Sequence, residues 1–421
     1  MIEEAIVHVG MHKTGSSSIQ DTLHNLASEP GAPVRYLKLN SPNHSGFFMT
    51  LLSEQPEEYR AHKINGCTKA EARAIQQRFE SDLEERLSAF GSRRLVVSGE
   101  GLSAPGVTEG MLVRLKRLLL RHCRSVRVIG YVRAPVGYMQ SAFQQRLKAG
   151  VQRDLDGQTL WPHYRKRFGT LDQVFGKENV VLVPFSPDSL YQGDAVLDFA
   201  RRTGFELSRE DLRRTNESIS LEACAVLFAM RKLEKVAPYG GYLIDNERLV
   251  RAVSCLGKGK LVFSPELVQP VLQAHCADLD WINERLGQSI EDEPRDASNS
   301  IESETDLLDV AVKHSPELWR LLEEEAVACE GRLSTAELVD RLSQLTARGP
   351  LAHQREVETT QSGGGAALHE GDPASLLEQA AQVFAQTTPE VASAFRRLVG
   401  PAQRQASRIG VVDTSSVQED R

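Results

Sequence analysis

The sequence has no CxxC pair among its six cysteines, and no apolar run of about 18 residues, the length that a membrane-spanning helix needs. Scattered single cysteines are typical of free thiols buried in a protein from a reducing compartment. The chain enters an apolar strand pattern within its first residues, so we expect no signal peptide. These absences predict a cytoplasmic protein without a membrane span.

The sequence also has no excess of basic residues. Its 50 lysines and arginines are outnumbered by 57 aspartates and glutamates, which gives a formal net charge of −7 at pH 7. Nucleic-acid-binding proteins usually carry a basic face that neutralises phosphates, so we expect no nucleic-acid partner. Any anion site must then be basic only locally. With 421 residues, 41% of them hydrophobic, the chain is long enough for one catalytic domain with appendages.

Near its start the sequence contains the pattern strand, glycine-bounded loop, helix. The stretch AIVHVGMHKTGSSSIQDTLHNL, which begins at Ala5, places β-branched residues before Gly10 and apolar residues at helical spacing after Gly15. The two glycines permit backbone angles that turn the peptide N–H groups between them toward an anion. The helix expected to begin near Ser16 adds the positive end of its dipole. The segment therefore predicts an anion-binding loop.

This loop lacks the lysine that a Walker A motif carries. In GxxxxGK[ST] a lysine follows the second glycine, but Ser16 stands there, and the lysine of the loop is Lys13, two residues before Gly15. The pattern indicates that the loop is not that of a standard nucleoside triphosphatase. An ordinary β-turn-α connection with a solvated lysine is the simpler alternative.

A second apolar run leads to a carboxylate. The stretch LVVSGEGLS begins at Leu95 with three apolar residues and no polar alternation, as expected of a strand buried on both faces of a parallel sheet, and it reaches Glu100. In open α/β sheets ligands bind at the carboxyl ends of the strands, so Glu100 is a candidate general base. Alternatively, Glu100 caps the helix expected near Thr108 or pairs with an arginine.

A third apolar run, residues 126–131, leads into Arg133 and Pro135, and Ser141 stands eight residues after Arg133. The proline is suited to begin a helix. Arg133 offers a planar fork of donors at the strand end, Ser141 offers a hydroxyl two turns further on, and together they can hold a phosphate. The alternative is an arginine in a salt bridge beside an ordinary helix.

These strands alternate with helical patterns. A fourth apolar run, residues 180–183, follows a helical pattern at 164–175. The alternation predicts an α/β fold with a doubly wound parallel sheet flanked by helices. We also expect an irregular insertion at 40–63 and one helix at 265–286, with Trp281 in the core.

Together these motifs resemble those of the sulfotransferases that use 3′-phosphoadenosine 5′-phosphosulfate (PAPS). A lysine two residues before the second glycine, followed by three serines, is similar to the 5′-phosphosulfate loop of that family. The segment VRVIGYVRAPVGYMQSAFQQRLKAG resembles its 3′-phosphate site, and LVVSGEGLS resembles the strand of several carbohydrate sulfotransferases whose terminal glutamate takes the acceptor proton. The resemblance spans residues 1–230, with its two specific motifs before residue 150. Because His12 stands where many members have proline and no glycine-rich adenine loop is found, the bacterial carbohydrate branch is the closer resemblance.

The resemblance implies a P-loop-type fold, PAPS as the sulfuryl donor and no metal. Lys13 is the expected catalytic residue at the leaving phosphate, Glu100 is the expected base, and His12 is its competitor. The expected cofactor-binding residues are Gly10, Lys13, Thr14, Gly15, Ser16, Ser17, Ser18, Arg133 and Ser141.

The sequence thus predicts metal-independent, in-line transfer of a sulfuryl group from PAPS to a hydroxyl or amine of a carbohydrate or glycoconjugate. A kinase or NTPase of the P-loop class is one alternative, and a non-catalytic nucleotide-binding scaffold is another. The acceptor and the oligomeric state are left open. The expected organisation is a sulfotransferase-like P-loop catalytic domain at 1–290, an acidic linker at 291–306, a helical extension at 307–348, a flexible spacer at 349–373, a helix at 374–400 and a disordered tail at 401–421.

Overall fold

The structure, a computed structural model, describes residues 1–26, 34–91, 93–213, 218–233, 250–251, 253–290 and 300–314. The chain divides into two compact units. The first comprises residues 1–142, 157–217 and 268–294, and the second comprises residues 143–156, 218–267 and 295–421. The predicted spacer, the helix at 374–400, the tail and the helical extension beyond residue 314 lie outside the described residues.

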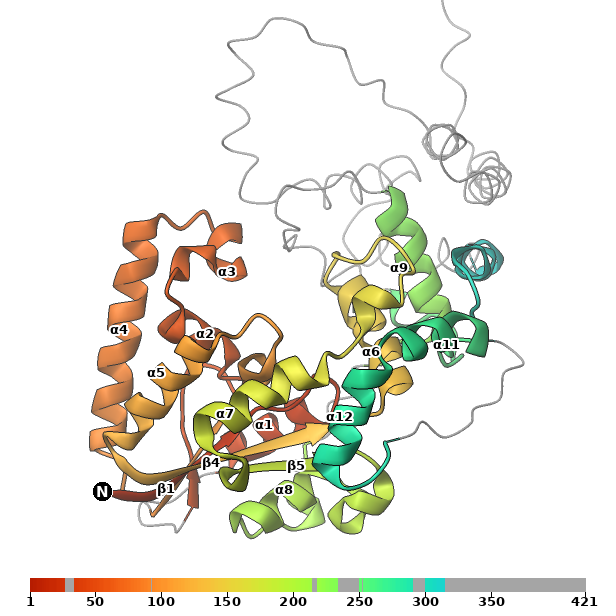
Figure 1. Cartoon of the computed structure of the whole chain (residues 1–421). Helices are drawn as coiled ribbons and strands as arrows, with labels where there is room; N and C mark the ends of the chain where they lie inside the picture. Colours follow the sequence, from red (N-terminus) through yellow and green to blue (C-terminus); the bar gives the residue numbers. More distant parts are fainter. Residues whose placement is uncertain are drawn as a thin grey trace, which may run out of the picture. The chain divides into compact units, whose positions relative to one another are not determined.

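A parallel sheet of five strands forms the centre of the first unit (Figure 1). The strands are β1 (Ile2–His8), β2 (Val34–Tyr36), β3 (Arg94–Ser98), β4 (Cys123–Val132) and β5 (Val180–Pro184), arranged in the order β2-β3-β1-β4-β5. In the register, His8 of β1 lies opposite Ser98 of β3 and Ile129 of β4. The carboxyl ends of the three central strands therefore meet at one edge, and the predicted α/β class with a parallel sheet is confirmed.

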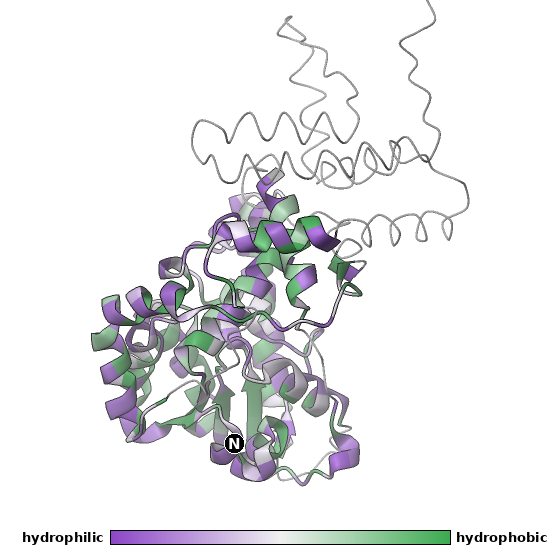
Figure 2. Ribbon diagram, turned by 90° about the vertical axis from the view of Figure 1, so that its right-hand side faces the viewer, coloured by the Kyte–Doolittle hydropathy of each residue, from purple (hydrophilic) through white to green (hydrophobic). Residues whose placement is uncertain are grey.

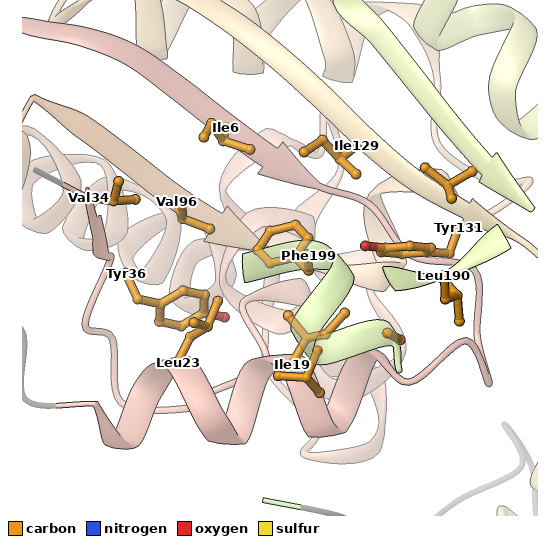
Figure 3. Packing of buried hydrophobic residues seen from close by; sticks show 13 residues of the cluster. Ile6, Ile19, Leu23, Val34, Tyr36, Val96, Ile129, Tyr131, Leu190 and Phe199 are labelled. Atoms are coloured by element: carbon orange, nitrogen blue, oxygen red, sulfur yellow. The ribbon is translucent and has the colours of Figure 1, made fainter. Parts of the chain in front are cut away.

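Two helices, α1 (Ser16–Asn25) and α8 (Ala195–Thr203), cover one face of this sheet (Figure 3). Apolar residues at helical spacing, such as Ile19 and Leu23 of α1, meet Ile6 and Ile129 of the sheet, and Phe199 of α8 completes the cluster. All five side chains are 1% exposed or less. Burying side chains of this size contributes about 1.5–3 kcal/mol each, so this cluster fixes α1, and with it the loop that precedes α1.

The opposite face carries α5 (Glu109–Leu120), the π-helical turn η4 (Arg165–Gly169), α7 (Thr170–Phe175) and α12 (Cys276–Leu286). Gly130 of β4 allows Phe168 of η4 to approach the sheet, because a Cβ atom on Gly130 would lie 3.1 Å from the Phe168 ring. The sheet is thus flanked by helices on both faces, and its strands stand out as hydrophobic between helices of mixed hydropathy (Figure 2).

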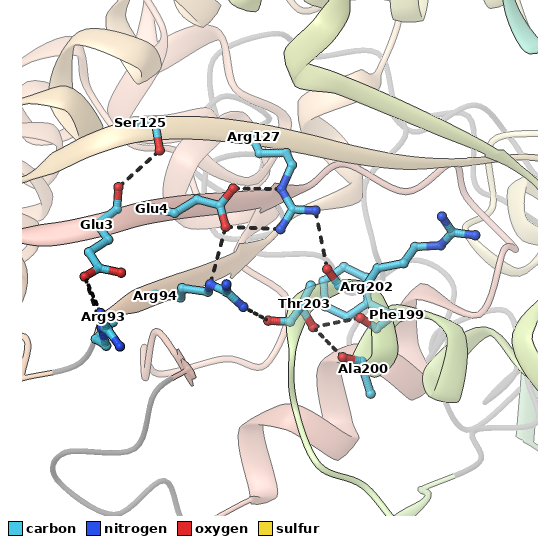
Figure 4. Close-up of polar contacts among 10 residues, drawn as sticks. All are labelled: Glu3, Glu4, Arg93, Arg94, Ser125, Arg127, Phe199, Ala200, Arg202 and Thr203. Carbon is cyan, nitrogen blue, oxygen red and sulfur yellow. Dashed lines mark hydrogen bonds and ion pairs between the residues drawn. The ribbon is translucent and has the colours of Figure 1, made fainter.

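Charged side chains on three strands hold the end of α8 against the sheet (Figure 4). Glu4 of β1 accepts two hydrogen bonds from Arg127 of β4, at 2.8 and 3.1 Å, and lies 3.7 Å from Arg94 of β3. The same two arginines donate to the carbonyls of Arg202 and Thr203 at the carboxyl end of α8. Because these carbonyls have no partner within the helix, the arginines satisfy them and meet the negative end of its dipole.

The predicted irregular insertion at 40–63 is instead largely helical. It contains α2 (Ser45–Leu52), η1 (Pro56–Glu58) and α3 (Arg60–Ile64). Its aromatic residues bring about this difference, because Phe48 is fully buried and Phe47 stacks on Phe79 of α4 (Lys69–Ser88), with ring centroids 4.6 Å apart. The insertion is therefore packed against the unit rather than solvated.

The helix predicted at 265–286 is two helices, α11 (Pro265–Ala274) and α12, which are separated at His275. The ring of His275 stacks on Trp161, with centroids 4.6 Å apart, and this contact marks the break. Trp281, expected in the core, is only half-buried.

The second unit contains α9 (Leu221–Leu233) and the end of α6 (Pro135–Lys148), which begins in the first unit. Phe143 of α6 contacts Phe228 and Phe263, and Phe263 forms a β-bridge with Ile301. At the described end of the predicted acidic linker, Ile301 is 2% exposed, Glu302 and Ser303 are exposed, and residues 304–314 are helical.

Of the five described cysteines, all free, Cys123 and Cys224 are buried as predicted, whereas Cys255 and Cys276 are exposed. Burial raises the pKa of the Cys123 thiol to about 12, so it stays protonated at neutral pH. Within the described residues, no helix is both long enough and apolar enough to cross a membrane.

Buried polar residues join the carboxyl ends of β1 and β3 to the start of α2. Nδ1 of His8 lies 2.7 Å from Oγ of Ser98, which also accepts a hydrogen bond from Gln20 of α1 at 3.0 Å. The backbone N–H of Ser98 donates to Nδ1 of His44 at 3.1 Å. Both histidines are 0% exposed, and Nε2 of each has no hydrogen-bond partner among the described residues. Burial lowers the pKa of each to about 3, so both are neutral in the folded protein.

These two histidines predict that the protein loses stability as pH falls below 6.5. Each stays neutral in the fold down to a pKa of about 3, whereas in the unfolded chain each binds a proton below its ordinary pKa of 6.5. The unfolded state therefore binds more protons in this range, and at pH 5 the free energy of unfolding should be lower by about 2 kcal/mol per histidine than at pH 8. Urea denaturation at a series of pH values measures this slope.

The matched variant is His44→Asn, whose side-chain oxygen can still accept from the Ser98 N–H. Its stability should fall less steeply between pH 6.5 and pH 5 than that of the unmodified protein. Equal slopes in the two proteins would contradict a neutral, buried His44.

Candidate functional site

The candidate site lies where the chain leaves the carboxyl ends of β1, β3 and β4. After β1 the chain forms β2 and β3 on one side of β1, and it then crosses to form β4 and β5 on the other side. The strand order therefore reverses at β1, and ligands of open α/β folds bind at such a switch point. The loop after β1 is adjacent to the turn after β3. A Cβ atom on Gly10 would lie 2.8 Å from Oγ of Ser16 and 3.0 Å from Cβ of Glu100. Only glycine fits there, and its φ of +61° is also one that other residues resist.

The loop is held in shape by its own hydroxyl groups. Oγ1 of Thr14 donates to the carbonyl of Met11 at 2.7 Å and accepts from the Met11 N–H at 3.3 Å, and Oγ of Ser16 donates to the same carbonyl at 3.3 Å. Thr14 is fully buried and Ser16 is 2% exposed. These two hydroxyls therefore shape the loop, which leaves their backbone N–H groups as the parts that can face an anion.

Lys13 occupies a backbone conformation that is uncommon for a residue with a side chain, with φ +66°. Nη1 of Arg133, which follows β4, donates to the Lys13 carbonyl at 2.8 Å. The two cations predicted from separate motifs thus belong to one site. Arg133 is fixed in turn by the hydroxyl of Tyr164, which donates to its carbonyl at 2.6 Å. Tyr164 is fully buried.

The first turn of α1 is open to an anion. Gly15 is its N-cap, with φ +76°, so no side chain caps the helix, and the first turn carries no acidic residue. Ser17 and Ser18 in this turn are half-buried. Uncapped N–H groups at a helix N-terminus attract negative charge, so this end of α1 adds to the positive potential of Lys13 and Arg133.

Glu100 begins a short 3-10 turn, η2 (Glu100–Ser103), and is half-buried. Nδ2 of Asn43 donates to Oε1 of Glu100 at 3.4 Å. Oγ of Ser103 donates to the carbonyl of Val9 at 2.8 Å, which ties the turn to the loop after β1. The alternative in which Glu100 caps the following helix is wrong, because the N-cap of α5 is Thr108, whose side chain accepts from Met111.

The buried guanidinium of Arg167 connects this turn to η4 of the same unit. It donates to the carbonyl of Ser103 at 3.0 Å and to the hydroxyl of Tyr138 at 2.6 Å, and it is 6% exposed. A buried charge of this kind is stable only when its donors are satisfied. Arg167 therefore belongs to the framework around Glu100 rather than to the set of groups that face a ligand.

The structure brings together most of the residues that the sequence singled out. Gly10, Thr14 and Gly15 share the loop after β1 with the half-buried His12, and the three serines form the first turn of α1 that follows it. Lys13 and Arg133 touch, and Glu100 lies beside Gly10. Ser141 stands apart. It is half-buried and lies two turns into α6, and no hydrogen bond joins it to Arg133, which is also among the described residues. A phosphate held by both would have to lie between them.

Sequence reasoning missed the residues that position this site. The contacts of Tyr164 with Arg133, Ser103 with Val9 and Arg167 with Ser103 join residues that are 31, 94 and 64 positions apart, which no local pattern encodes. Asn43, which donates to Glu100, lies in the stretch at 40–63. The one feature of the sequence that could have indicated it is an amide side chain beside a predicted turn.

Comparison with protein-family models, curated proteins and solved structures found no match for this chain. Among the described residues, no three His, Cys, Asp or Glu side chains are grouped closely enough to hold a metal ion. The chemistry of the site must therefore be argued from its own residues.

The contact between Tyr164 and Arg133 predicts that removal of the Tyr164 hydroxyl oxygen lowers the stability of the fold. Tyr164→Phe leaves the Arg133 carbonyl without its donor in a buried position, so the free energy of unfolding should fall by about 1–2 kcal/mol. Chemical denaturation measures the loss. The control is Tyr191→Phe, because Tyr191 is 39% exposed. If both variants changed stability equally, Tyr164 would not support Arg133 as described.

Proposed function

We propose that this protein transfers a sulfuryl group from PAPS to a hydroxyl or amine of a carbohydrate or glycoconjugate acceptor. The proposal rests on the sequence resemblance and on the residues that converge on the loop after β1. The observation that carries it is the pair of close approaches at that loop, Glu100 to Gly10 and Arg133 to Lys13. Glu100 supplies a candidate base beside the loop, and Arg133 supplies a second cation next to Lys13. This arrangement suits a nucleotide with phosphates at both the 5′ and the 3′ positions.

In this mechanism the donor's 5′-phosphosulfate lies in the loop, against the N–H groups at the start of α1. Lys13 neutralises the charge that develops on the leaving phosphate oxygen as the bond to sulfur breaks. Glu100 accepts the proton of the acceptor hydroxyl, whose oxygen attacks sulfur in line with the leaving group. Positioning and charge stabilisation supply most of the rate, as in phosphoryl transfer.

Arg133 has two roles in this proposal. Its Nη1 holds the Lys13 carbonyl, which keeps the loop lysine in its unusual backbone conformation. Its planar guanidinium fork can also bind the 3′-phosphate, together with the Ser141 hydroxyl. A lysine could not replace Arg133, because one ammonium group has no planar fork with which to serve both partners.

Nucleotide choice tests the paired anion sites. At equal concentrations, adenosine 3′,5′-bisphosphate should raise the melting temperature clearly more than AMP, since a ligand at 100 times its Kd stabilises a protein by about 2.7 kcal/mol. Thermal denaturation of the full chain measures both shifts. Equal shifts for the two nucleotides would contradict the 3′-phosphate site.

Arg133→Ala separates the two roles of this arginine, with Arg93→Ala at an exposed ion pair as the control. If Arg133 binds the 3′-phosphate, the variant should bind the bisphosphate no better than AMP while still binding both. Loss of binding of both nucleotides would mean that Arg133 serves only to hold the loop.

The identity of the base is tested by Glu100→Gln, which keeps the shape of the side chain and an acceptor for Asn43 but cannot take a proton. Turnover should fall by about 100-fold or more, with little change in affinity for the bisphosphate. Steady-state rates and calorimetric binding measure the two effects. The competitor variant is His12→Asn: if it loses turnover while Glu100→Gln keeps it, the loop histidine is the base.

A further inference from the structure

A cavity of about 640 Å³ lies on the face of the sheet that carries α7, within the first unit. Its walls come from η4, α7, the turn before β5 and α12. It is separate from the loop after β1. That loop follows the carboxyl end of its strand, whereas Lys177, which lines the cavity, lies just before the amino end of β5. Its size falls within the range of about 300–1,000 Å³ that is typical of small-molecule sites.

Three cationic side chains of this cavity form no ion pair within the described part of the chain. Arg165 and Lys166 of η4 and Lys177 line it, and none of their side chains makes a hydrogen bond or ion pair with another described residue. All three are exposed. They differ from Arg285, whose guanidinium pairs with both oxygens of Asp172 at 2.8 and 2.9 Å and also reaches the carbonyl of Val180.

The acidic residues of the cavity cancel only part of this charge. Asp172 is used by Arg285. The carboxylate of Asp278 accepts three N–H groups, from the indole of Trp161 and the backbone of Tyr164 and Arg165, each at 2.7 or 2.8 Å. Glu284 is the remaining carboxylate, and it is exposed. Among the described lining residues, three cations without an ion pair thus stand against two carboxylates without one, Asp278 and Glu284, so the net charge of the lining is positive and favours an anion.

The rest of the lining indicates which kind of anion. Trp281 is half-buried and lines the cavity beside Gly169. A Cβ atom on Gly169 would lie 3.6 Å from the Trp281 ring. An indole offers an apolar surface on which the C–H groups of a sugar ring can pack. The amide of Gln173 and the hydroxyl of Thr170 also line the cavity and can bond to sugar hydroxyls. An inorganic anion would use the cations but not these groups.

We propose that this cavity binds an acidic saccharide unit, one that carries a carboxylate or sulfate group. If the saccharide is the acceptor, this inference rests on the proposed function, and the acceptor is then an acidic glycan. Tyr164 lies between the two sites, because its backbone N–H donates to Asp278 of the cavity and its hydroxyl donates to Arg133. A glycan chain held here would be anchored on the same rigid unit that carries the candidate active site.

The test is calorimetric titration of the full chain, without PAPS, with a heparin-derived tetrasaccharide, a hyaluronan-derived tetrasaccharide, neutral maltotetraose and inorganic sulfate. The charge-reversal variant is Lys166→Glu with Lys177→Glu. Its control is Lys38→Glu with Lys69→Glu, which changes the net charge equally at exposed positions outside the cavity. Trp281→Leu tests the aromatic contact without adding charge.

At least one acidic tetrasaccharide should bind, and the Lys166/Lys177 variant should weaken it at least tenfold while the control leaves it unchanged. Trp281→Leu should weaken it at least threefold, and maltotetraose and sulfate should bind far more weakly. The proposal is overturned if no acidic saccharide binds, if charge reversal has no effect, or if sulfate binds as tightly as the tetrasaccharide.

Binding of adenosine 3′,5′-bisphosphate to the same variants keeps this inference apart from the proposed function. The Lys166/Lys177 variant should bind the bisphosphate normally. Acidic saccharide binding in a protein that binds no bisphosphate would support the cavity site and contradict the sulfotransferase proposal. Bisphosphate binding without saccharide binding would do the reverse.

Discussion

The close approach of Gly10 to Glu100 is the constraint on which the rest of the candidate site depends. It exists because β1 and β3 are parallel neighbours in register, so that the chain leaves both strands at the same level. Any side chain at position 10 would separate the loop from the turn that carries Glu100. Ser103, bonded to Val9, holds the same two segments together, and the buried Arg167 ties the turn to η4. The site is thus fixed by the sheet and by buried polar contacts, and not by the loop alone.

On the other side of β1, a hydrogen bond links the two cations. Arg133 fixes the carbonyl of Lys13, and Tyr164 fixes that of Arg133. Through Asp278 this chain of contacts continues to the cavity beside α12, where Arg165, Lys166 and Lys177 form no ion pair with another described residue. A protein with a net charge of −7 therefore gathers positively charged side chains at two places within one unit. That distribution suits a reaction in which donor and acceptor are both anionic.

The sequence predicted the elements whose signal is local. Uninterrupted apolar runs revealed β1, β3, β4 and β5, and glycine spacing revealed the loop. It could not reveal contacts such as that between Trp161 and Asp278, which are 117 residues apart and depend on how α12 packs. The helices within 40–63 were missed because turn residues flank them, while the burial of Phe48 decides their conformation. Trp281 was expected in the core because helical spacing shows a face but not what covers it. The positions of the candidate site residues were thus largely predictable, whereas their supporting contacts and the cavity were not.

The central claim is that the loop after β1 holds PAPS for transfer, and the most direct measurement is transfer of ³⁵S from labelled PAPS to oligosaccharides. The assay mixes acidic and neutral acceptors with the full chain in the presence of EDTA, and it compares the unmodified protein with Lys13→Ala and with the surface control Lys69→Ala. The account predicts label in an oligosaccharide without added metal, at a rate at least about 100-fold lower for Lys13→Ala and unchanged for Lys69→Ala. Absence of label from every acceptor, or equal rates for Lys13→Ala and the unmodified protein, would contradict it.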